Sequence, residues 1–352
     1  MTLDDGFGGP PVHDQRRREG LDANTSTGNR TTKCDSHVFS MYVIRRIGVY
    51  AFSLILASIL VFVVMSVLPG DPATVMLGTQ ATPESVAVLR SELGLDRPLV
   101  VQYLDWFTGM IRGDLGESVF TGQPIGPQIA DRLAVTLPLA LMALTMTTLI
   151  SFPLGVFAAA RHRTLGDTVV SVLSQLGLAI PAFWAGLMLI TVFAINNSWF
   201  PASGFPGWDE SVSQSLRALI LPAFSLAIVQ SSIITRYVRS AVLETLREEY
   251  IRTARSKGLS KSQALWRHGL RNAAIPVLTI LGLQFAALLS GTVIIETVFV
   301  LPGLGRMLLD GITGRDLPLV QGGAFVIVAF ILTINLLVDL SYRVIDPRVR
   351  QQ

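Results

Sequence analysis

The feature that most constrains this chain is a set of six long runs that contain no Asp, Glu, Lys or Arg. Each is near or above the roughly 20 residues that a helix needs to cross a bilayer. Core helices of soluble proteins rarely exceed about 14 residues, so buried helices of a large soluble protein are the weaker interpretation. We therefore predict an all-α integral membrane protein with six transmembrane helices. The runs are Ile47–Leu68, Leu133–Ala160, Thr168–Phe200, Ala218–Thr235, Ala273–Ile295 and Leu317–Val338.

Composition agrees with this class. The sequence is 50% hydrophobic and only 15% charged, whereas soluble domains carry about 25% charged residues. Residues 1–40 are polar and show no helical or strand period, which predicts a disordered tail. Met41 resembles a natural translation start. Either the start of this sequence is assigned too early, or residues 1–40 are a genuine N-terminal extension. The single cysteine, Cys34, lies in this tail and leaves no disulfide framework or Cys-based metal cluster.

The distribution of basic residues predicts the orientation. Lys and Arg crowd the segments before the first run, after the second, between the fourth and fifth and after the sixth, and such segments face the cytoplasm. Residues 70–132 instead carry eight carboxylates against four arginines. We expect both termini in the cytoplasm and the segment 70–132 outside, in a multi-pass protein of a prokaryotic inner or plasma membrane.

The segment 70–132 is not expected to be a featureless loop. Thr82 can cap a helix that begins at Pro83 and ends at Gly94, and Pro98 begins a second helix with apolar residues near helical spacing. Two interpretations stay open for this second helix. It packs on its own protein, or it offers a docking surface to a partner.

Several kinds of chemistry are missing. The sequence has no G-x-x-x-x-G-K-[ST] loop, so we expect no ATP to bind this chain, and it has no H-E-x-x-H or G-x-S-x-G motif. Its four histidines lack metal-ligand spacing, so we expect no catalytic residue, metal or bound cofactor. Glu296 and Asp339 are the carboxylates nearest to the runs. Glu296 is either a polar cap at the membrane interface or a gate or partner contact.

The most informative segment is the long basic loop 237–272. Ala241–Lys257 has apolar residues at helical spacing, and Gly258 is suited to end that helix. Ser260 and Gln263 then form the pattern of a capping box, which predicts a second short helix. One interpretation is an anchor whose charges only fix topology, but topology needs few charges and no capped hairpin.

Within this loop, E-E-Y-I-R-T-A-R-S-K-G-L-S (Glu248–Ser260) resembles the Glu-Ala-Ala loop of binding-protein-dependent ABC importer permeases. In that pattern Glu-Ala-Ala is followed, after three further residues, by Gly. Here Arg252, Thr253, Ala254 and Gly258 hold those places. Arg252 and Thr253 depart from the general pattern, although Arg-Thr-Ala is typical of the dipeptide, oligopeptide and nickel branch.

Further matches to the first, or B-type, permease of that branch cover about residues 41–352. They are R-R-I (45–47), L-P-G-D-P-A (68–73), L-G-L-D-R-P-L-V-V-Q-Y (93–103), G-D-L-G-E-S (113–118), I-P-A-F-W-A-G (180–186), E-T-V-F-V-L-P-G-L-G-R (296–306) and I-D-P-R-V-R (345–350).

The resemblance implies the type I ABC importer permease fold in residues 41–352, with an external segment at 70–132 and a cytoplasmic coupling loop at 237–272. It implies a second homologous permease, two ATP-binding subunits that hold ATP and Mg²⁺, and an extracytoplasmic solute-binding protein. This chain is then a channel subunit without enzymatic activity of its own. The residues that would couple it to the ATPase are Arg252, Thr253, Ala254, Arg255, Gly258 and Leu259.

Two other functional classes fit the sequence less well. An intramembrane enzyme or assembly factor should show converging His, Asp or Glu in its spans, and these spans show essentially none. A secondary carrier would usually show repeats and charged or broken segments at mid-membrane. The expected substrates are dipeptides or oligopeptides, with nickel chelates or glutathione-like solutes as the alternative.

Overall fold

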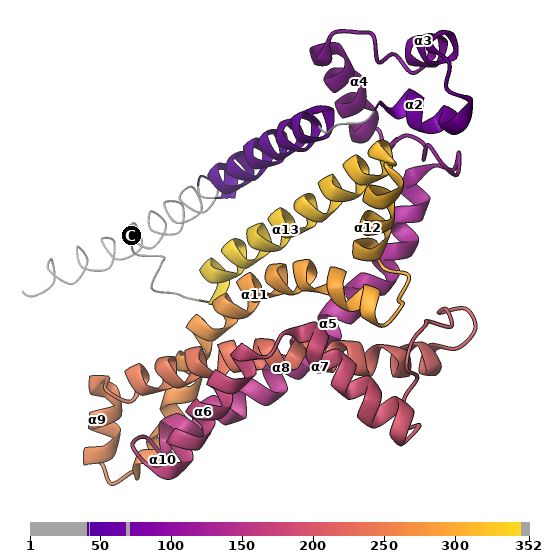
Figure 1. The fold of residues 1–352 in the computed structure, drawn as a ribbon. Helices are drawn as coiled ribbons and strands as arrows, with labels where there is room; N and C mark the ends of the chain where they lie inside the picture. Colours follow the sequence, from indigo (N-terminus) through magenta and orange to yellow (C-terminus); the bar gives the residue numbers. More distant parts are fainter. Residues whose placement is uncertain (1–40, 42, 68–70, 346–352) are drawn as a thin grey trace, which may run out of the picture.

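The computed structural model describes residues 41, 43–67 and 71–345, and the predicted tail 1–40 lies outside them. The described chain is helical, apart from one isolated bridge between Glu117 and Pro124. Figure 1 shows helices of very different length, with α2 to α4 at one end and α9 and α10 at the other. The first span is Val43–Val67. It is followed by α2 (Pro72–Leu77), η1 (Gly78–Gln80), α3 (Pro83–Glu92), α4 (Leu99–Ile111), α5 (Ile125–Ala160), α6 (Leu165–Ala179), α7 (Ala182–Leu189), η2 (Ile190–Asn196), α8 (Val212–Thr245), α9 (Glu249–Ser256), α10 (Lys261–Ala264), η3 (Leu265–Gly269), α11 (Leu270–Val298), α12 (Leu304–Gly314) and α13 (Leu317–Ile345).

The predicted spans are confirmed, with one correction. Five helices are long and apolar enough to cross a membrane, and a sixth span exists if the pair α6 and α7–η2 counts as one. That pair is bent by 97°, so the run Thr168–Phe200, predicted as one transmembrane helix, consists of two helices joined by a sharp bend. The break lies at Ile180–Pro181, where both residues are extended. Proline disfavours a helical conformation in the residue before it, and this local effect interrupts the span.

The core of the molecule lies where α5 packs along α8. Small residues recur on α5 at every fourth position, as Thr147, Ser151 and Gly155, and all three are buried. A side-chain carbon added at Gly155 would lie 2.6 Å from Cβ of Val238 on α8. Such small residues let helices approach closely in membranes, where dispersion contacts rather than hydrophobic exclusion hold helices together.

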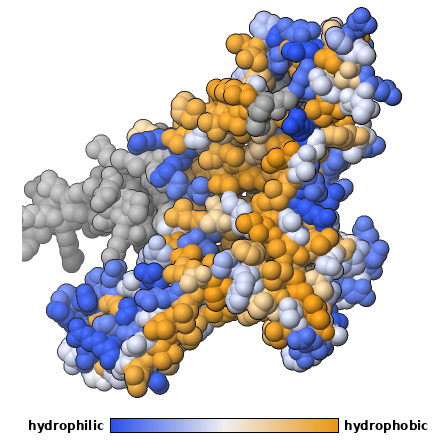
Figure 2. Space-filling view, in the orientation of Figure 1, coloured by the Kyte–Doolittle hydropathy of each residue, from blue (hydrophilic) through white to orange (hydrophobic). Residues whose placement is uncertain are grey.

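The surface has the pattern of a membrane protein. Figure 2 shows apolar residues over the middle of the molecule and hydrophilic residues gathered at the two ends, around α3 and around α9–α10. The first span has 11% of its apolar window buried and α13 only 6%. These helices therefore leave most of their apolar surface for lipid or for another protein.

The segment 71–132 contains the helices expected there. Thr82 caps α3 and forms a capping box with Ser85, and α4 begins directly after Pro98. On α4, the Tyr103 ring meets Phe62 of the first span at 5.5 Å between ring centroids. The Tyr103 hydroxyl also lies 2.9 Å from the Ser58 hydroxyl. One face of α4 thus packs on its own protein, as the first of the two interpretations states.

Candidate functional site

The hairpin (residues 246–269) differs from its prediction at the start. One helix was expected over Ala241–Lys257, but α8 ends at Thr245 and α9 begins at Glu249. Glu248 is extended, with φ −63° and ψ 145°, so the chain turns between the two helices. The turn allows Ile251 to become fully buried in a cluster with Ala254 and Ala264. Burial of such a side chain contributes roughly 1.5–3 kcal/mol, and sequence periodicity within one helix cannot reveal this tertiary contact.

The turn after α9 follows its prediction closely. Gly258 has φ +95°, a conformation that costs a residue with a Cβ about 1 kcal/mol. The Ser260 hydroxyl accepts from the Gln263 backbone N–H at 3.3 Å, and the Gln263 side chain accepts from the Ser260 backbone N–H at 3.0 Å. The capping box is therefore confirmed. The following α10 has only 4 residues and continues through η3 into α11.

The hairpin has one buried and one exposed face. Ala254 is 9% exposed and packs within the hairpin, so its small side chain allows close approach of the chain's own second helix. Leu259 packs against the same cluster. The exposed face carries Arg252, Thr253 and Arg255. Arg252 lies 2.8 Å from the Glu249 carboxylate in an exposed ion pair, which contributes little to stability and leaves the arginine accessible.

The base of the hairpin is tied to the long helices. The Asn272 side chain on α11 donates to the Tyr250 hydroxyl on α9 at 2.9 Å. A side-chain carbon at Gly269 would lie 2.9 Å from Leu265 and 3.4 Å from Thr245, which shows how closely η3 approaches the end of α8. The hairpin is thus a short, rigid projection joined to α8 on one side and α11 on the other.

A buried ion pair near the hairpin was not foreseen from the sequence. Asp167, at the start of α6, accepts from Arg239 of α8 at 2.6 and 2.9 Å, and from the Arg163 backbone N–H at 3.0 Å. The side chain of Asp167 is 7% exposed. His162, one of the four histidines, lies 3.1 Å from the same carboxylate. An aspartate placed just before a long apolar run, beside a basic turn, was the only available signal.

Glu296 lies at the opposite end of α11 from the hairpin and is fully buried. Its carboxylate accepts from the Thr136 hydroxyl of α5 at 2.6 Å and from the Arg306 backbone N–H of α12 at 3.1 Å. The Thr136 hydroxyl oxygen in turn accepts from the Leu304 backbone N–H at 2.9 Å. Gly303 at the N-cap of α12 provides no side-chain cap, so residues from α5 and α11 perform that function. A role of Glu296 as a gate or partner contact stays a prediction.

The described residues contain no group of three or more His, Cys, Asp or Glu side chains that could hold a metal ion. In the part of the chain that is described, the polar features that stand out are the hairpin and three buried carboxylates, Asp167, Glu296 and Asp316. They mark the two ends of the helices that form the core.

Two family profiles match this chain. The family described as "Binding-protein-dependent transport system inner membrane component" matches residues 151–351. The N-terminal region of the same kind of membrane component matches residues 39–140. The chain belongs to this family. It is an inner-membrane permease of the ABC importer type, with several membrane-spanning helices.

The permease is similar over nearly the full length of curated relatives. A putative peptide transport system permease of Brucella abortus (strain 2308) is 42% identical over 308 residues, which are 88% of this chain and 98% of the relative. The dipeptide transport system permease of Escherichia coli K12 is 37% identical over 335 residues, covering 88% and 99%. A glutathione transport system permease of Salmonella typhi is 37% identical over 309 residues, covering 88% and 98%.

Proposed function

We propose that this permease is a channel subunit of an ATP-driven importer of peptides. It would enclose the translocation path together with a second homologous permease. Two ATP-binding subunits would bind beneath the pair, and an extracytoplasmic solute-binding protein would deliver the substrate. In this proposal ATP and Mg²⁺ reside on the ATP-binding subunits, and this chain contributes no catalytic residue.

The observation that carries the proposal is the hairpin. It is an ordered, capped structure that presents Arg252 and Arg255 on its exposed face, and its base is fixed to α8 and α11. A rigid projection of this kind suits a preformed cleft on a partner, because its conformational entropy is already lost before binding. Closure of the ATP-binding subunits would then move the hairpin and shift the permease between two states.

Reconstitution of the complete transporter tests this coupling. Gly258→Arg places a bulky side chain at φ +95°, on the surface that would enter the cleft. We expect the variant to insert and pair with the second permease, but to lose ATPase docking or to hydrolyse ATP without uptake. Gly258→Asn is the matched control, since asparagine tolerates the left-handed conformation and adds less bulk. Wild-type docking and uptake in Gly258→Arg would show that the hairpin is only a topological anchor.

The exposed arginines should contribute less than the turn. Arg252→Gln and Arg255→Gln would each remove one exposed positive charge. Salt weakens the attraction between such a charge and a partner, with a screening length of about 10 Å at 0.1 M ionic strength. We expect a mild loss of ATPase retention that disappears at high salt. A loss that is independent of salt would contradict a role in charge pairing.

The sidedness of the permease is part of the proposal. Both termini and the loop 237–272 are placed in the cytoplasm, and residues 70–132 outside. In a Cys34→Ser background, cysteine at Ser91 should react with an impermeant thiol reagent in intact cells, whereas cysteine at Ser262 should react only after lysis. Both positions are exposed, so reversed labelling would reject this orientation.

The substrate class rests on the relatives, which are named for peptide, dipeptide and glutathione transport. We therefore favour short peptides, with glutathione-like solutes as the second candidate and nickel chelates as a weaker one. Competition of labelled dipeptide uptake by unlabelled dipeptide, glutathione or a nickel chelate separates the three. Competition by glutathione alone would move the assignment to the second candidate.

A further inference from the structure

A pocket of about 430 Å³ lies at the end of the permease that we assign to the outside. Its walls come from the 118–121 turn, the beginning of α5 and helix α12. Two arginines, Arg132 and Arg306, line it together with Gln128 and Thr121. Helix α5 has 36 residues, or roughly 54 Å at about 1.5 Å per residue, which is longer than the roughly 30 Å of a bilayer core. Its beginning therefore extends beyond the hydrocarbon.

Most side-chain hydrogen-bond donors of the two arginines are not used within the described part of the protein. Arg132 is partly buried, and its side chain makes no hydrogen bond or ion pair with any other residue that the structure describes. The Arg306 guanidinium lies 3.9 Å from a carboxylate oxygen of Asp310, whose side chain is 73% exposed. A solvent-exposed pair at that distance is weak. Arg132 is partly buried and the Arg306 side chain is 36% exposed, so both guanidinium groups are accessible to a solute in the pocket, where a carboxylate would accept charge-assisted hydrogen bonds from them.

The second carboxylate of the pocket is already satisfied. Asp316 accepts from the Ser118 hydroxyl at 2.5 Å and from the backbone N–H groups of Val119 and Leu319, each at 3.3 Å. These bonds fix the 118–121 turn to the start of α13 and so hold one wall. The opposite wall is fixed through the Arg306 backbone N–H, which donates to buried Glu296. The 118–121 turn and the backbone of Arg306 are thus held in fixed positions around the pocket.

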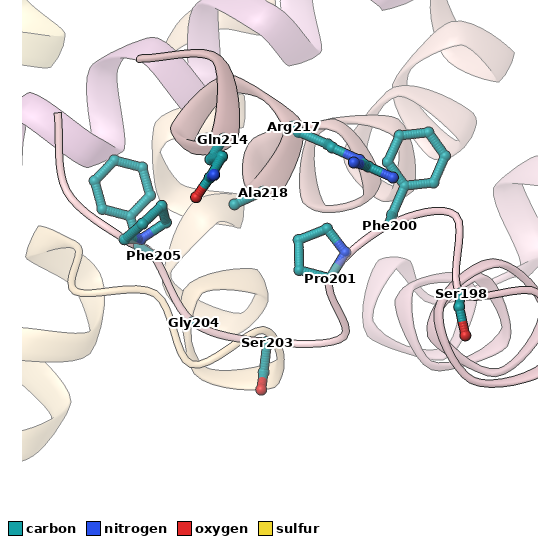
Figure 3. Close-up of a pocket in the computed structure, with 10 residues that line it drawn as sticks. Ser198, Phe200, Pro201, Ser203, Gly204, Phe205, Gln214, Arg217 and Ala218 are labelled. Atoms are coloured by element: carbon teal, nitrogen blue, oxygen red, sulfur yellow. The ribbon is translucent and has the colours of Figure 1, made fainter. Parts of the chain in front are cut away.

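A second pocket on the same side provides a contrast. Arg217 lines a cavity of about 600 Å³ with Phe200 and Gln214. Figure 3 shows Arg217 and Phe200 side by side at one end of that cavity. The Arg217 guanidinium donates through Nε and Nη2 to the Trp199 carbonyl, and its central carbon lies 5.9 Å from the Phe200 ring centre. The Arg217 donors are therefore occupied by a carbonyl of the same chain, whereas the side-chain donors of Arg132 have no partner among the described residues.

We propose that the pocket of Arg132 and Arg306 binds the terminal carboxylate of a peptide entering from outside. This proposal rests on the proposed function, because peptides are the solutes considered. Guanidinium groups bind carboxylates through paired, charge-assisted hydrogen bonds. The terminal carboxylate is shared by every peptide whatever its side chains, and 430 Å³ accommodates a terminal residue with its neighbour. An acidic side chain of the solute-binding protein is the competing occupant.

Chemical modification of arginine tests the pocket directly. The purified transporter in nanodiscs, with whatever subunits it retains, is treated with phenylglyoxal, and modified arginines are identified by mass spectrometry. We expect dialanine to slow the modification of Arg132 and Arg306, and dialanine amide to have no effect. Arg217 should be insensitive to both. Equal protection by acid and amide, or protection by neither, would overturn the assignment to a peptide carboxylate.

Variants sharpen the result. In Arg132→Gln, the dialanine concentration that half-protects Arg306 should rise on the order of 10- to 100-fold, as expected for loss of hydrogen bonds to a charged group. Arg217→Gln is the matched control and should leave that concentration unchanged. If a solute-binding protein protects both arginines and dialanine does not, the competing occupant is correct and our proposal is wrong. Because protection is read on this chain alone, failure of ATPase docking would not be confused with failure of the pocket.

Discussion

Replacement of Glu296 by alanine tests how helix α12 is held. In the structure the first turn of α12 has no cap of its own, and the Glu296 carboxylate accepts the Arg306 backbone N–H and the Thr136 hydroxyl. Hydrogen bonds to charged groups contribute about 1.5–3 kcal/mol each. Only the bond from the Arg306 backbone N–H breaks when α12 opens, and taking the upper value for it, Glu296→Ala should make local opening of the α12 N-terminus easier by about 3 kcal/mol.

Hydrogen–deuterium exchange measures that opening. At about 1.4 kcal/mol per tenfold, the Arg306 amide should exchange on the order of 100-fold faster in Glu296→Ala than in the wild type. Glu296→Gln should show a smaller acceleration, because its amide oxygen can still accept from one of the two donors. The comparison requires peptides that contain residues 304–306, measured in the same detergent or nanodisc for every variant.

The matched control is Asp310→Ala, which removes a carboxylate from the same helix. The Asp310 side chain is 73% exposed and lies 3.9 Å from the Arg306 guanidinium, so exchange at the Arg306 amide should be unchanged. Wild-type exchange in Glu296→Ala would refute the idea that this carboxylate caps α12. If Glu296→Gln also loses uptake while exchange and assembly stay near wild type, the gate interpretation of Glu296 would be favoured instead.

Three further predictions concern other parts of the permease. Asp167→Asn should lower the free energy of unfolding by about 1–3 kcal/mol, because it leaves the donors of Arg239 without their charged acceptor; adding Arg239→Gln should recover part of the loss in thermal denaturation, and no recovery would argue against a specific pair. Gly155→Leu should lower the melting temperature strongly and Gly155→Ala less, since a Cβ at this position would lie 2.6 Å from Cβ of Val238. Equal melting temperatures for both variants and the wild type would contradict the close α5–α8 contact. Removal of residues 1–40 should leave insertion and uptake intact, as judged by uptake per inserted transporter, because the segment has little apolar content; normal expression with lost uptake would contradict this.

The sequence predicted features whose causes are local. The left-handed turn at Gly258 and the capping box of Ser260 and Gln263 depend on residues within a few positions of each other, and both are present in the structure. The start of α3 after Thr82 has the same origin. The long apolar runs were also found, because the thickness of a bilayer sets their length.

Features that depend on distant partners were missed. The break between α8 and α9 exists because Ile251 packs against Ala264, and nothing in the helical periodicity of 241–257 marks it. The bond between Thr136 and Glu296 joins residues 160 positions apart. The prolines show a similar limit, since Pro138, Pro153 and Pro222 remain inside helices while Pro181 ends one. A proline within an apolar run therefore does not by itself predict whether the helix continues or ends, because the packing around it decides.

The hairpin and Glu296 lie at opposite ends of the single helix α11. Its 29 residues span roughly 44 Å at about 1.5 Å per residue. If α11 tilts as a rigid body by about 5° around its middle, each end moves by roughly 2 Å in opposite directions, which is the size of the helix shifts found at switching interfaces. At the middle of α11, Gln230 of α8 donates to the Gln284 side chain at 2.5 Å, so a hydrogen bond between the two helices marks the point about which α11 would tilt. A force on the hairpin would therefore arrive at the first turn of α12 as a sideways displacement, with no unfolding in between.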